Sequence, residues 1–99
     1  MSDPANVVWR HLTVAGNEHG VAIVQSGLDP GTRAVWGGGF AGGPSTSESE
    51  IGAADAQGGA PMIGSYLEYD PATDSTYFIA LFACPYGSSV RTHVWALAG

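Results

Sequence analysis

Apolar side chains recur at every second position over most of this chain. Six segments show this period and are rich in β-branched and aromatic residues, which favour strands. They cover residues 7–14, 21–26, 32–36, 62–69, 76–84 and 89–98. Short stretches of Gly, Pro, Asp, Asn and Ser follow most of these segments and are typical of turns. The pattern predicts an antiparallel all-β fold.

Residues 37–60 interrupt the strand pattern. Their first part, residues 37–43, is dominated by glycine, which predicts a long flexible loop with Phe40 as the apolar tip of a lid. Their second part begins with Ser47-Glu48-Ser49-Glu50, a capping box, and continues with alanines up to Gly58. This second part predicts a short helix over residues 48–57.

The first and last predicted strands carry mirrored patterns. Trp9 and His11 lie two residues apart near the start, and His93 and Trp95 do so in reverse order near the end. Residues two apart on a strand share a face, so each pair points to one side of its strand. Antiparallel pairing then predicts three opposed pairs: Trp9 with Trp95, His11 with His93, and Thr13 with Arg91.

Several predicted strands are apolar on both faces, most clearly from Tyr77 to Phe82. Such strands need a covering layer on each side, and the chain offers only one short helix. We therefore expect one domain over residues 1–99, built as a six-strand barrel or curled sandwich. Its outer faces should be covered by a second copy in a homo-oligomer, most simply a dimer. Val94 and Phe78 are interpreted as outward residues of that interface.

Composition and charge narrow the classes of partner. Apolar residues make up 44% of the chain and charged residues 12%, and the net charge is −6. With three arginines and no lysine, this balance repels phosphate backbones and excludes nucleic acid and anionic membranes as expected partners. The chain has no long apolar run and its start does not resemble a signal peptide, which predicts a soluble, cytoplasmic protein.

The facing histidines are the first candidate for chemistry. Neutral imidazole both donates and accepts hydrogen bonds, so His11 and His93 beside Arg91 could bind a polar ligand, share a metal or exchange protons. The ordinary alternative is a pair of strand histidines whose polar atoms are satisfied within the fold. A metal needs a third ligand, and only Glu18 and His19 lie on a nearby turn. Without a spaced ligand signature we expect no metal site and no cofactor.

The tryptophans are the second candidate. Trp9, Trp36 and Trp95 are suited to stacking on sugar rings or heterocycles, although the same residues also serve in cores and interfaces. Arg10 and Arg33 could clamp a carboxylate of a ligand, but we expect pairing within the chain. The partners expected for these arginines are Glu68, Asp70 and Asp74. Cys84 is the single cysteine, has no basic neighbour in the sequence and is expected to be a small core residue.

These features favour a binding module. The predicted ligand is a small molecule or a carbohydrate, held on an aromatic face or in a pocket. The residues expected to contact it are Trp9, His11, Trp36, Arg91, His93 and Trp95. Two alternatives stay open: a cofactor-independent isomerase, cyclase or lyase that uses His11 and His93 as acid and base, and a self-assembling structural subunit. No motif identifies catalytic residues.

Overall fold

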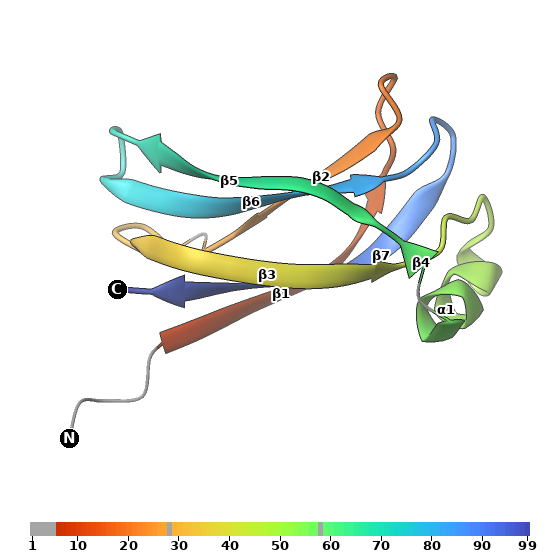
Figure 1. The fold of residues 1–99 in the computed structure, drawn as a ribbon, viewed down its shortest axis with the longest axis horizontal. Helices are drawn as coiled ribbons and strands as arrows, with labels where there is room; N and C mark the ends of the chain where they lie inside the picture. The colour runs from red at the N-terminus through yellow and green to blue at the C-terminus, as the bar shows by residue number, and fades with distance from the viewer. Residues whose placement is uncertain (1–5, 28, 58) are drawn as a thin grey trace.

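Two antiparallel sheets packed face to face form the body of this protein. The computed structural model describes residues 6–27, 29–57 and 59–99 (Figure 1). The first sheet has the strand order β1-β7-β3-β4, and the second sheet has the order β2-β6-β5. The strands are β1 (Asn6–Ala15), β2 (Val21–Ser26), β3 (Ala34–Gly42), β4 (Gly59–Ala60), β5 (Met62–Asp70), β6 (Ser75–Ala83) and β7 (Ser89–Ala98).

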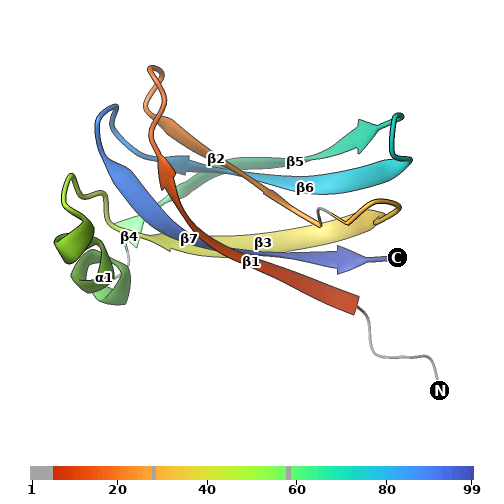
Figure 2. The ribbon, with the colours of Figure 1, turned by 180° about the vertical axis from the view of Figure 1, so that it is seen from behind.

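The all-β class and the curled sandwich are confirmed, whereas a closed barrel is not. The two sheets curve together, but in the described chain their strands do not join into one continuous sheet. The chain passes between the sheets at the β1–β2, β2–β3, β4–β5 and β6–β7 connections, and the β1–β2 and β6–β7 connections lie at the same end of the sandwich (Figure 2). The terminal strands β1 and β7 are neighbours in the first sheet.

The predicted register of the terminal strands is confirmed. Strands β1 and β7 pair antiparallel over their full lengths, with Trp9 opposite Trp95 and His11 opposite His93. Thr13 lies opposite Arg91, as expected. The outward residues of both strands are therefore neighbours on one surface.

The prediction of a long glycine-rich loop is wrong for residues 37–42. These residues continue strand β3, which pairs with β7 on one side and β4 on the other. A Cβ atom added to Gly37 would lie 2.3 Å from Cγ of Phe78, and one added to Gly38 would lie 2.9 Å from Cζ2 of Trp95. Aromatic rings from two other strands thus occupy the space above and below this backbone, which explains why a strand forms without side chains of its own.

The core between the sheets consists mostly of small side chains. Buried Ala, Val and Cys residues from both sheets surround Phe78 and Phe82. Val94 and Phe78 belong to this core and are almost fully buried, so their interpretation as outward interface residues is wrong. Cys84 is buried as expected, and burial raises the pKa of its thiol.

The helix α1 (Glu48–Gln57) has the predicted bounds. It lies at the end of the first sheet, beside the ends of β3 and β4 (Figure 1). A Cβ atom added to Gly42 would lie 2.3 Å from Cα of Asp55, and the Gly43 N–H donates to the Ala54 carbonyl over 3.2 Å. The helix therefore packs directly on the strand backbone at Gly42. Within residues 6–27, 29–57 and 59–99, no helix has the length and apolar character needed to cross a membrane.

Candidate functional site

The outer face of the first sheet gathers the residues predicted to bind a ligand. Strand β1 contributes Trp9 and His11. Strand β7 contributes Trp95 and His93, because residues that are directly opposite in an antiparallel pair lie on the same face of the sheet. Strand β3 contributes the positions that alternate with its inward glycines. We call this surface the aromatic face, and it consists of Trp9, His11, Trp36, Phe40, Arg91, His93 and Trp95.

A chain of hydrogen bonds crosses the aromatic face. Nδ1 of His11 lies 2.8 Å from Nδ1 of His93, and Nε2 of His93 lies 2.8 Å from Oδ1 of Asp55 on helix α1. The side chain of His93 is 17% exposed and that of Asp55 is 20% exposed, while His11 is open to solvent. The chain of bonds therefore runs from a shielded carboxylate to an accessible imidazole.

Aromatic rings hold both imidazoles in place. The Trp9 indole is stacked on the His11 ring with an angle of 4° and a centroid separation of 5.4 Å. The Phe40 ring is stacked on the His93 ring with an angle of 28° and a separation of 4.8 Å. Such contacts restrict the rotation of each imidazole and favour the bonded geometry. Phe40 lies inside a strand and supports His93, so it is not the tip of a loop.

Trp95 forms a flat surface on this face. Its indole lies across the backbone of Gly38, because three of its ring atoms are within 3.0 Å of the position where a Cβ would be. Only glycine leaves this space open, and the ring in turn covers the glycine backbone. Trp36, two residues before Gly38 on the same face, is 67% exposed.

Arg91 lies on the aromatic face one pair beyond the histidines. It is exposed and faces Thr13 across the two strands. In the register of β1 with β7, Arg91 is the diagonal neighbour of His11. Diagonal neighbours on a sheet are close enough for a long side chain to reach from one to the other. The sheet thus carries a cationic side chain on the same face as the open end of the hydrogen-bond chain.

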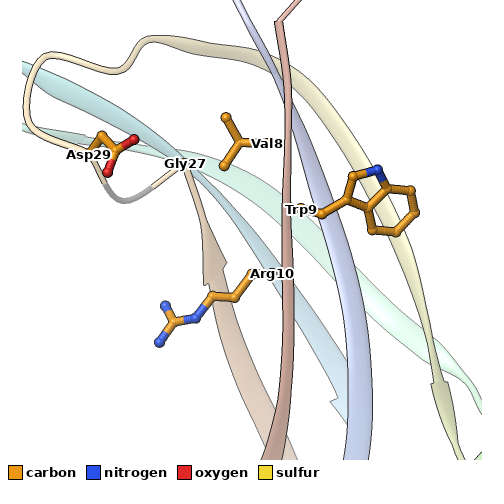
Figure 3. Close-up of a pocket in the computed structure, with 5 residues that line it drawn as sticks. All are labelled: Val8, Trp9, Arg10, Gly27 and Asp29. Atoms are coloured by element: carbon orange, nitrogen blue, oxygen red, sulfur yellow. The ribbon is translucent and has the colours of Figure 1, made fainter.

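A small pocket lies on the other side of β1. It has a volume of about 160 Å³ and is lined by Val8, Trp9, Arg10, Gly27 and Asp29. Figure 3 shows the Trp9 indole on the side of β1 opposite to Arg10 and Asp29. Arg10 donates from Nη1 to the Gln25 carbonyl over 3.1 Å. This pocket is separate from the histidine pair.

The predicted pairing with an acidic side chain is confirmed for Arg33, whereas the hydrogen bond given for Arg10 goes to the backbone carbonyl of Gln25. Arg33 bonds to Asp74 with 2.6 Å between Nη2 and Oδ2. The Tyr69 hydroxyl donates to the other oxygen of the same carboxylate over 2.9 Å. Arg33, directly before β3, therefore ties the start of that strand to the β5–β6 turn.

Sequence reasoning missed two residues that build the site. Asp55 was predicted to be helical, but nothing local to the helix indicates that it reaches His93 on a strand 38 residues away. Gly42 resembles the other glycines of its segment in sequence, yet its backbone lies against Asp55. Among the described residues, no group of three or more His, Cys, Asp or Glu side chains has a geometry that could hold a metal ion.

Comparison with known proteins does not assign this arrangement to a family. No protein-family model matches the chain, and no curated protein or solved structure matches it significantly.

Proposed function

We propose that the aromatic face binds a small neutral or weakly anionic molecule that combines a flat apolar side with hydroxyl groups, such as a sugar ring. The observation that carries this proposal is the Trp95 indole lying flat across Gly38 beside the histidine pair. A sugar stacks its C–H groups on an indole, while its hydroxyls need hydrogen-bonding partners at the ring edge.

The polar groups around Trp95 suit that chemistry. His11 is open to solvent and offers a ring nitrogen, and Arg91 offers guanidinium donors on the same face. The net charge of −6 repels polyanionic ligands but does not oppose a neutral one. Strands hold all these side chains except Asp55, so the face needs little ordering when a ligand binds.

Binding of neutral oligosaccharides tests the proposal. ¹⁵N-labelled protein is titrated with soluble gluco-, xylo- and manno-oligosaccharides, and the amide and indole shifts are followed. Trp36→Ala removes an exposed ring from the aromatic face and should weaken binding about fivefold, because one stacking contact contributes about 1 kcal/mol.

The matched control is Tyr86→Ala, which removes another highly exposed ring, from the β6–β7 connection. It should leave the affinity unchanged. Shifts confined to residues outside the first sheet, or equal losses in both variants, would contradict the proposal.

Self-assembly through strand β5 is a second candidate. Strand β5 is one of the two edge strands of the second sheet, and it exposes apolar side chains on both of its faces. These include Ile63, Tyr66, Leu67 and Tyr69. An open edge with such side chains is a template for another strand, and two copies of β5 related by a two-fold axis would pair antiparallel.

Sedimentation tests this second candidate. The unmodified protein should sediment as a dimer at micromolar concentration, and Ile63→Lys should shift it to a monomer because a lysine on an edge strand opposes pairing. The Trp36→Ala variant serves as the control and should remain a dimer. A monomeric wild-type protein would exclude assembly through β5.

A further inference from the structure

The bonded order of Asp55, His93 and His11 determines which nitrogen of His11 is free. An ionised carboxylate only accepts hydrogen bonds, so the His93 Nε2 must carry the proton that bonds to Asp55. A neutral His93 then has a bare Nδ1, which accepts from the Nδ1–H of His11 at 2.8 Å. His11 is left with an unprotonated Nε2.

We propose that Asp55, His93 and His11 form a polarised proton relay whose free end, Nε2 of His11, is the proton acceptor toward a hydroxyl of a ligand on the aromatic face. In this step the ligand O–H bond breaks, its electron pair stays on oxygen, and the proton moves to Nε2. His11 becomes an imidazolium that already donates through Nδ1 to His93. The Asp55 carboxylate at the far end stabilises the positive charge.

Because Nε2 of His11 accepts a proton, the relay calls for a ligand that carries a hydroxyl group. The transfer to a ligand rests on the proposed binding role of the aromatic face, whereas the proton order is a property of the free protein. In this relay His93 and Asp55 are positioning residues, and only His11 touches the ligand. Arg91, on the same face and diagonal to His11, is placed to stabilise the developing oxyanion.

Gly42 is part of the relay although it has no side chain. Its backbone lies so close to Asp55 that any added carbon would collide with the helix, since a Cβ would be 2.3 Å from Cα of Asp55. Gly42→Ala should therefore displace α1 and break the contact between Asp55 and His93 without changing either residue. Among the described residues, no atom beyond the neighbouring backbone of the same helix lies within 4 Å of the Cβ position of Gly52, so Gly52→Ala is a matched substitution that leaves the relay intact.

Long-range ¹H–¹⁵N spectra of the full chain at about pH 8, above the ordinary range of imidazole titration, read the proton position on each ring nitrogen. His11 should show a protonated Nδ1 and a bare Nε2, and His93 the reverse. Asp55→Ala and Gly42→Ala should each replace these single forms by mixtures of the two tautomers. Gly52→Ala should keep the single forms.

Acylation by diethyl pyrocarbonate gives a second measurement. The bare nitrogen bonds to a carbonyl carbon of the reagent, ethyl carbonate leaves with the bonding electrons, and the ring N–H proton passes to water. Mass spectrometry should show the rate at His11, relative to His19, falling several-fold in Asp55→Ala and Gly42→Ala but not in Gly52→Ala.

Opposite tautomers in the wild type, or unchanged spectra and rates in both disrupting variants, would overturn the relay. If the tautomers are as expected but no oligosaccharide binds, the ligand proposal fails while the proton order stands.

Discussion

Gly37, Gly38 and Gly42 each leave open a space that a neighbouring group occupies. The groups are the Phe78 ring on the inner side, the Trp95 ring on the outer side and the backbone of helix α1 at Asp55. The absence of side chains thus lets β3 lie between two aromatic rings and a helix. At the residue scale, function depends as much on these glycines as on the histidines they help to place.

Gly37→Ala should lower the free energy of unfolding by about 2 kcal/mol, because an added methyl overpacks the core against Phe78. Urea denaturation measures the change. Gly64→Ala on β5 is the control, since its Cβ would meet only Leu81 Cδ1 at 3.4 Å, and this variant should be as stable as the wild type or slightly more so. Equal destabilisation by both variants would argue against ring packing at Gly37.

At the scale of elements, the β5–β6 hairpin is tied to β3 by side chains around its turn. Asp74 has a positive φ of 50°, where Asn and Asp are tolerated better than other residues with a side chain. The hydrogen bond from Tyr69 and the nearby Arg33 guanidinium hold the pKa of the Asp74 carboxyl below its usual value. The same contact raises the pKa of Tyr69. Its hydroxyl donates a hydrogen bond to the Asp74 carboxylate, and the negative charge of that carboxylate disfavours an ionised tyrosine.

A lowered carboxyl pKa means that folding favours the ionised form of Asp74. Its stabilising contribution is present above the ordinary pKa of Asp, about 3.9, and is lost as the pH falls through the lower pKa of the folded state. Asp74→Asn keeps the turn conformation but removes this titration. The stability difference between wild type and variant, from urea denaturation, should shrink between about pH 5 and pH 2. A difference that is constant over this range would show that the carboxyl pKa is the same in both states.

At the scale of the whole molecule, the two sheets meet over a core of alanines and valines. Small side chains let the sheets approach closely, and the rings of Phe78 and Phe82 fill the remaining space. Val94 is 0% exposed in this core, although its strand also carries the aromatic face on its other side. Every second residue of β7 thus packs in the core and stabilises the fold, while the residues between them belong to the candidate site.

Val94→Ala should destabilise the protein by about 2 kcal/mol, because it removes two buried methyl groups and leaves a cavity. Val7→Ala is the matched substitution in the same sheet, at a side chain that is 49% exposed, and should change stability by less than about 0.5 kcal/mol. Thermal denaturation at several protein concentrations measures both. A Val94→Ala effect that appears only at concentrations where the protein associates would place Val94 in an interface instead.

Local patterns in the sequence were enough to predict several features of the fold. The period of two predicted the strands apart from the short β4 and the extension of β3 to Gly42, and the mirrored Trp and His positions predicted the register of β1 with β7. The capping box predicted the bounds of α1. These features follow from interactions between residues close in sequence or from the strict alternation of side chains along a strand.

Only the tertiary structure decided the rest. Alternation shows which residues share a strand face with Phe78 or with Val94. It does not show which of the two faces is the core when both faces are apolar. The strand character of residues 37–42 depends on rings from β6 and β7, and the reach of Asp55 to His93 depends on how α1 packs at Gly42. Each of these outcomes is set by contacts between residues far apart in the chain, which no local pattern encodes.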